Sequence, residues 1–199
     1  TTPIADGDRI IVRATPNIYP PYGLFTLNVN AIEHTGVGDL KAAMERLRRQ
    51  LEVEGLFDDS RKRPLPEFPE RIGLVTSREA AACGDFLRIL QNRWGGVEVE
   101  LAHVAVQGAS AVGDICTALA FFNARPVDDR PDVLVLTRGG GSLEDLAAFN
   151  AEATVRAVFA STIPIVVAVG HERDVSLWEL AADVRAATPS NAAECVVPD

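Results

Sequence analysis

Val133-Leu134-Val135-Leu136 runs directly into Thr137-Arg138-Gly139-Gly140-Gly141-Ser142, so that an apolar strand pattern is followed by a glycine-rich loop. A second pair of this kind lies downstream, where Ile165-Val166-Val167-Ala168-Val169 precedes Gly170-His171-Glu172-Arg173-Asp174. Strands that are apolar at every position are typical of parallel sheets covered on both faces. Because ligands of such sheets bind at the carboxyl ends of the strands, the two loops predict one shared crevice.

Strand and helix patterns alternate through the second half of the chain. Strands are expected at 71–76, 97–101, 132–136 and 164–169, and helices at 78–92, 109–123, within 142–160 and at 175–183. A last helix is expected to begin at Thr188, with Pro189 as its first residue. This alternation predicts an α/β fold with a doubly wound, mostly parallel sheet.

The first 70 residues have a different character. Residues 1–36 contain two strand patterns, 9–13 and 23–30, separated by turn-forming residues. A helix is expected from Asp39 to near Gly55, and a polar, proline-rich linker follows over residues 58–70. Because two or three strands cannot bury a core alone, residues 1–36 are predicted to be the last part of a β-domain. Residues 37–70 then form a helix and linker, and residues 71–199 the α/β domain.

Composition excludes several classes of protein. The chain has 19 Lys and Arg against 28 Asp and Glu, a net charge of −9, which argues against a broad basic surface for nucleic acid. No apolar stretch approaches the length of a membrane-spanning helix, and no membrane partner is expected. The chain lacks an initiator Met and a signal peptide pattern, so we expect a piece of a longer protein.

The cysteines and four of the aromatic residues are expected to lie in the core. The three cysteines form no metal-binding pattern and are predicted to be small buried residues in a reducing cytoplasm. Four aromatic residues are also predicted to lie in the core rather than to stack on bases: Trp94, Phe121, Phe122 and Trp178.

The glycine-rich loop carries the first candidate site. The amides of Gly139, Gly140 and Gly141 could turn toward an anion, and Ser142 could cap the following helix. Arg138 would add a permanent charge with forked donors suited to phosphate. The alternative is a tight strand-to-helix turn with Arg138 in a salt bridge. The loop is neither a Walker loop nor a Gly-x-Gly-x-x-Gly motif.

The second loop and the first helix add titratable groups. His171 follows a glycine at a strand end, where an imidazole could act as a general acid or base. Asp174 could orient His171, contact a metal or cap a helix. Asp85 lies among small residues of the helix expected at 78–92. By itself Asp85 could equally be a solvated or capping carboxylate.

These motifs taken together resemble the large subunit of bacterial exodeoxyribonuclease VII. The matching segments, in order, are Glu54-Gly55-Leu56-Phe57-Asp58, Pro69-x-Arg71-Ile72-Gly73-x-Val75-Thr76-Ser77, Val106-Gln107-Gly108, Arg138-Gly139-Gly140-Gly141-Ser142-Leu143-Glu144-Asp145-Leu146, Phe149-Asn150, Val169-Gly170-His171-Glu172-x-Asp174 and Ala182-Asp183-x-Arg185-Ala186-x-Thr188-Pro189-Ser190. Residues 1–36 resemble the end of the OB-fold that precedes the catalytic domain in this family.

The resemblance implies an exonuclease that cleaves single-stranded DNA from both ends to short 5′-phosphorylated products, in complex with a small helical subunit. It assigns the catalytic residues as Asp85, Arg138, His171 and Asp174. The region that binds the small subunit would be largely absent from this chain. No cofactor is firmly implied; Mg²⁺ is left open, with Asp85 and Asp174 as its ligands. Two alternatives stay open: a non-catalytic module that binds a nucleotide or single-stranded DNA, and a small-molecule enzyme that binds a sugar phosphate or nucleotide.

Overall fold

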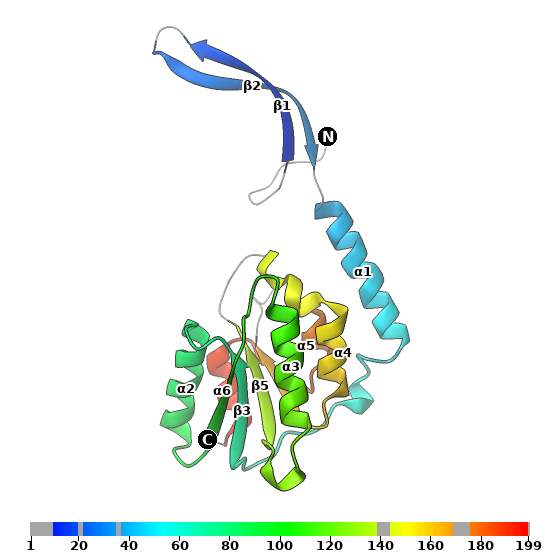
Figure 1. Ribbon diagram of the computed structural model, residues 1–199, viewed down its shortest axis with the longest axis vertical. Helices are drawn as coiled ribbons and strands as arrows, with labels where there is room; N and C mark the ends of the chain where they lie inside the picture. The colour runs from blue at the N-terminus through cyan, green and yellow to red at the C-terminus, as the bar shows by residue number, and fades with distance from the viewer. Residues whose placement is uncertain (1–9, 20–21, 35–36, 139–143, 169–175, 199) are drawn as a thin grey trace. The chain divides into compact units, whose positions relative to one another are not determined.

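The computed structural model describes residues 10–19, 22–34, 37–138, 144–168 and 176–198 (Figure 1). Contacts within the chain divide it into two units, Thr1–Gln50 and Leu51–Asp199. The predicted division at residues 36 and 70, including the OB-fold origin of the first part, stays a prediction.

The first unit contains an antiparallel hairpin. Strand β1 (Ile10–Tyr19) pairs with β2 (Leu24–His34), with an irregularity in the register between Arg13 and Ala14. Both strands are longer than predicted. Strand β1 continues because Pro16 is taken into the ladder opposite Leu27, and a proline is tolerated in an edge strand. Strand β2 continues to His34 because its last four residues pair with residues 10–13. Helix α1 (Val37–Val53) follows.

The second unit is built on a five-stranded sheet in the order β4-β3-β5-β6-β7, with every neighbouring pair parallel. Its strands are β3 (Arg71–Thr76), β4 (Glu98–His103), β5 (Val133–Thr137), β6 (Ile165–Ala168) and β7 (Val184–Arg185). Every described residue of β5 and β6 is buried, as their continuous apolar runs predict. The predicted α/β fold with a parallel sheet is confirmed. Strand β7 was not predicted.

Helices cover both faces of this sheet (Figure 1). Helix α2 (Ala81–Arg93) packs against α6 (Pro189–Val196) on one face. On the other face α3 (Ala111–Asn123) packs against α4 (Glu152–Ala160), and α4 packs against α5 (Leu177–Ala181). Helix α6 begins as predicted, because Thr188 Oγ1 accepts a hydrogen bond from Asn191 N at 3.0 Å and Pro189 follows it.

Alternation along β3 explains how the two layers meet the sheet. Ile72 and Leu74 belong to the core cluster that includes Phe86 of α2. Gly73 lies between them and faces the other way, toward Phe122 of α3. A Cβ at Gly73 would lie 2.5 Å from Leu134 Cδ2 and 3.2 Å from Phe122 Cζ, so the glycine is required by close packing.

We therefore expect Gly73→Ala to destabilise the chain by about 1–3 kcal/mol, the usual cost of overpacking a filled core. Urea unfolding measures the loss. Gly84→Ala is the matched control, because a Cβ at Gly84 meets nothing within 4 Å, and on a helix it should be neutral or stabilising. Equal stability of the Gly73 variant and the wild-type chain would contradict this view of the packing.

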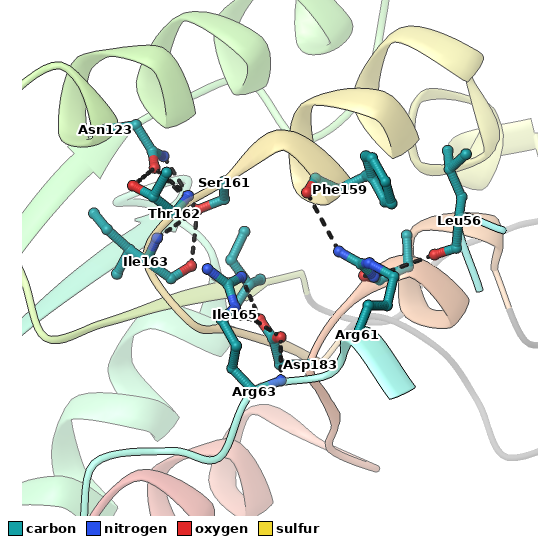
Figure 2. A network of polar contacts seen from close by, with 11 residues as sticks. Leu56, Arg61, Arg63, Asn123, Phe159, Ser161, Thr162, Ile163, Ile165 and Asp183 are labelled. Atoms are coloured by element: carbon teal, nitrogen blue, oxygen red, sulfur yellow. Dashed lines mark hydrogen bonds and ion pairs between the residues drawn. The ribbon is translucent and has the colours of Figure 1, made fainter. Parts of the chain in front are cut away.

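The segment before β3 is fastened to the sheet layer by Arg61 (Figure 2). Its Nη1 donates to Ala181 O at 2.7 Å and Leu56 O at 3.1 Å, and its Nη2 donates to Phe159 O at 3.3 Å. The guanidinium also lies 4.3 Å from the centre of the Phe159 ring. One arginine thus binds three backbone carbonyls, one at the end of α5, one in the last turn of α4 and one in the turn after α1.

Two residues farther along, Arg63 binds the buried carboxylate of Asp183 (Figure 2). Asp183 accepts hydrogen bonds from Arg63 N at 2.8 Å, Nε at 3.1 Å and Nη2 at 2.8 Å, and from Ile165 N at 2.8 Å. Burial raises the pKa of Asp183, but the hydrogen bonds from Arg63 and Ile165 prevail and hold the pKa below its usual value. Asp183 therefore ties the linker, the start of β6 and the start of β7 together.

The predictions for aromatic and cysteine residues are confirmed only in part. Phe122 and Trp178 are buried and Trp94 packs partly against the core, but Phe121 is 54% exposed, since it neighbours Phe122 on the outer side of α3. Cys83 is buried, whereas Cys195 is exposed, so the prediction for Cys195 was wrong.

Candidate active site at the carboxyl edge of the sheet

The chain builds the sheet outward in opposite directions from the two neighbouring strands β3 and β5. From β3 the chain crosses through α2 to β4 on one side, and from β5 it crosses through α4 to β6 on the other. The carboxyl ends of β3 and β5 thus form a topological switch point, where ligands bind in open α/β sheets. Here Thr76 Oγ1 donates to Thr137 O at 2.8 Å, which links the two strand ends.

Arg138 follows β5 at this point and is 4% exposed. Its guanidinium carbon lies 5.8 Å from the centre of the Phe149 ring, and Phe149 in turn packs on Trp178 at 4.3 Å between ring centres. Its backbone N donates to Ala168 O, the end of β6, at 3.2 Å. Because the guanidinium charge is permanent, this packing fixes a cation at the strand end that precedes the glycine run.

The two candidate loops start from neighbouring strands, as predicted. Thr137 pairs with Ala168 in the parallel register of β5 and β6. The predicted phosphate-binding residues Gly139, Gly140, Gly141 and Ser142 and the predicted catalytic residues His171 and Asp174 lie outside the described residues. Their assignment stays a prediction.

Asp85 lies on the second turn of α2, and its side chain is 49% exposed. Its Oδ1 accepts from Nη2 of Arg88, three residues along the same helix, at 3.0 Å. The structure gives this carboxylate a position on a helix surface beside Gly84, where a Cβ would meet nothing within 4 Å. A local ion pair of this kind is weak, so Asp85 can exchange Arg88 for another ligand at little cost.

A further polar cluster adjoins the end of β3. Ser77 Oγ donates to Glu79 Oε2 at 2.8 Å, and this bond, together with a backbone bond, holds the pKa of Glu79 below its usual value. His103, the last residue of β4, accepts from Arg78 N through Nδ1 at 3.1 Å. His103 is not among the predicted site residues, and this hydrogen bond gives it a structural role beside the site.

Described residues that follow the two candidate loops in the sequence are also joined. Leu177 N donates to Asn150 Oδ1 at 2.8 Å, which links α5 to the end of η3 (Glu144–Asn150). Ser176 donates from N and from Oγ to the buried Glu179 Oε2, at 2.6 and 2.7 Å. The bond from Ser176 N to the Glu179 side chain is one half of a capping box at the start of α5.

No group of three or more His, Cys, Asp or Glu side chains within the described ranges could hold a metal ion. Among the same residues, no helix is long and apolar enough to cross a membrane.

A family model described as "Exonuclease VII, large subunit" matches residues 56–199, which include the whole five-stranded sheet. The chain belongs to this family. Curated relatives named "Exodeoxyribonuclease 7 large subunit" align with almost the whole length of this chain. The relative from Corynebacterium glutamicum is 48% identical over 198 residues, covering 100% of this chain and 47% of the relative.

Other relatives of the same name come from other organisms. The protein of Thioalkalivibrio sulfidiphilus is 50% identical over 194 residues, covering 98% of this chain and 43% of the relative. That of Mycobacterium tuberculosis is 46% identical over 198 residues, covering 98% and 46%. The chain thus spans about half the length of the curated relatives that it matches.

Proposed function

We propose that this chain is the catalytic part of an exonuclease that hydrolyses phosphodiester bonds of single-stranded DNA and releases short 5′-phosphorylated products. Its family membership supports this activity. The single structural observation that carries it is Arg138, a buried cation at the switch point of the sheet, directly before the glycine run. A permanent charge with forked donors is suited to hold a backbone phosphate there.

In the proposed mechanism, Arg138 and the amides of Gly139–Gly141, with Ser142, hold the scissile phosphate. They stabilise the negative charge that grows on its oxygens as the reaction proceeds. A water oxygen attacks phosphorus, the bond from phosphorus to the 3′ oxygen breaks, and the 3′ oxygen leaves with a proton. The phosphate stays on the 5′ side of the next nucleotide.

His171 moves the proton in this scheme, either by activating the water or by protonating the leaving oxygen. Asp174 orients the imidazole. Asp85 is the second acid or base, or a ligand of a cation. If the reaction uses Mg²⁺, Asp85 and Asp174 are the carboxylates that would hold it.

We also propose a partner subunit and a cellular location for this protein. The working form is a complex with a small subunit in the bacterial cytoplasm, and single-stranded DNA is the substrate. Because the chain carries a net charge of −9, capture of DNA depends on local cations at the site and on parts of the complex outside this chain.

The test is cleavage of end-labelled single-stranded and duplex DNA by the full-length large subunit assembled with its small subunit, in Mg²⁺ and in EDTA. We expect the single strand to be degraded to short 5′-phosphorylated products and the duplex to be spared. The EDTA lane decides the metal question. Binding without cleavage by a correctly assembled complex would favour the non-catalytic module, and activity on mononucleotides alone would favour the small-molecule enzyme.

A further inference from the structure

Arg185 is a second arginine at the carboxyl edge of the sheet. It ends β7 and pairs in register with Val167 of β6, which pairs with Leu136 of β5. Neighbouring strands lie about 4.8 Å apart, so the backbone of Arg185 is about 10 Å from that of Leu136. Arg138 follows Leu136 by two residues. Both arginines therefore stand at the same end of the sheet, two strands apart.

A buried carboxylate fixes the Arg185 guanidinium. Glu179 has a fully buried side chain, and its Oε1 accepts from Arg185 Nε at 3.3 Å. The other oxygen of Glu179 is occupied by Ser176 N and Oγ. Because a buried carboxylate is costly unless its oxygens are bonded, Glu179 holds Arg185 in one orientation and restricts its rotamers.

The guanidinium keeps donors for another anion. It has five N–H donors in a rigid fork, and within the described part of the chain its contact with Glu179 uses only Nε. The Arg185 side chain is 39% exposed. A half-exposed arginine whose plane is set by a neighbouring carboxylate is pre-organised to bind a phosphate with its terminal nitrogens.

Helix α5 connects the two arginines. Trp178 packs on Phe149, whose ring lies beside the Arg138 guanidinium, and the next residue, Glu179, binds Arg185. The residue that leads into this helix, Ser176, is bonded to the same Glu179. Helix α5 therefore contacts Arg185 directly, through Glu179, and Arg138 indirectly, through Trp178 and Phe149.

We propose that Arg185 binds a backbone phosphate of the DNA strand beside the phosphate held by Arg138, so that two fixed arginines direct the strand along the carboxyl edge of the sheet. This inference rests on the function proposed above for its choice of substrate. In a chain of net charge −9, such a local pair of cations is where a polyanion gains most from electrostatic attraction.

The test measures binding of a fluorescent, phosphorothioate-linked oligothymidylate, which resists cleavage, to the full-length protein in its complex over a range of salt concentrations. Arg185→Ala should weaken binding about 10-fold, as expected for a lost charge-assisted hydrogen bond. It should also reduce the slope of log Kd against log salt by about 0.7, the value for one phosphate contact on a single strand. Arg185→Lys should keep the slope.

Arg71→Ala is the matched control. Arg71 also pairs with a glutamate through Nε, with 3.4 Å to Glu98 Oε2, and its side chain is 30% exposed, but it begins β3 at the opposite edge of the sheet. The Arg71→Ala variant should bind DNA with the wild-type slope of log Kd against log salt. Arg185→Gln, which keeps a donor for Glu179 without the charge, replaces Arg185→Ala if melting shows that the alanine variant unfolds.

The outcomes separate the two proposals. A wild-type slope in both uncharged Arg185 variants, or an equal loss in Arg71→Ala, would overturn the role of Arg185 even if the complex cleaves DNA. A reduced slope confined to the Arg185 variants would support that role even if the wild-type complex cleaves nothing, in which case the proposed nuclease activity fails by itself.

Discussion

His171→Ala is expected to lower the rate of single-strand cleavage by at least about 100-fold, the smallest usual contribution of a general acid or base. The residue follows Ala168 by three positions, and Ala168 O accepts from the backbone N of Arg138. The strand that leads to His171 is thereby joined to the strand that leads to the glycine run. Cleavage of end-labelled single-stranded DNA by the assembled full-length complex measures the effect, and circular dichroism checks the fold.

His103→Ala is the matched control for this experiment. His103 is also an imidazole at the carboxyl end of a strand of the same sheet, but it ends β4, and its Nδ1 accepts from Arg78 N. We expect its cleavage rate to stay within about threefold of wild type, since a surface hydrogen bond contributes about 0.5 kcal/mol. Full activity in a folded His171→Ala complex would remove His171 from the mechanism.

Asp183→Ala is expected to reduce the free energy of unfolding by about 3–5 kcal/mol, the usual cost of removing one partner of a buried ion pair. The variant leaves the guanidinium of Arg63, with 30% of its side chain exposed, without its partner, and it leaves Ile165 N–H without an acceptor. Urea unfolding followed by tryptophan fluorescence reports this loss, because both tryptophans of the chain, Trp94 and Trp178, lie in the second unit.

Asp132→Ala is the control for Asp183→Ala. Asp132 also accepts from two backbone amides, Glu70 N at 2.8 Å and Arg71 N at 2.9 Å, but it is exposed to solvent. Its loss should cost only about 1–2 kcal/mol. Equal losses in the two variants would show that burial of the Asp183 pair adds nothing.

The lowered pKa of Asp183 also predicts how the free energy of unfolding changes in acid. The folded pKa lies below the unfolded one, so the stabilising contribution is complete above the unfolded pKa and is lost as pH falls through the folded pKa. The stability of the wild-type chain should therefore fall more steeply in this acid range than that of Asp183→Ala.

The second unit could be predicted from sequence because its strands are marked by unbroken apolar runs. Apolar side chains point to both faces of the strand in Val133-Leu134-Val135-Leu136, so both faces must be covered to remove them from water. The structure buries every residue of β5. Strand β7 was not predicted because a strand of two residues is too short to show an alternating or continuous apolar pattern. The hairpin was predicted too short because Pro16 was taken to end a strand, although an edge strand accepts it.

The candidate site was predictable to a different degree from one residue to another. Arg138 was recognisable from its position between a strand and a glycine run, and its burial was not, because Phe149 reaches it from η3. Asp85 became a candidate only through the family resemblance. The buried Glu179 was missed although Ser176 and Glu179 have the spacing of a capping box. Its contact with Arg185 depends on the pairing of β7 with β6, which local sequence does not encode.

The two outer strands of the sheet bear on how this protein avoids self-association. An unpaired strand edge can recruit a strand from another chain and start aggregation. Strand β7 offers an edge of only two residues. Strand β4 is longer, but it carries Glu98, with 70% of its side chain exposed, and Glu100, each in an ion pair that would have to be disrupted. Both edges of the sheet are thus poor templates for a strand from another chain, because one is short and the other is charged.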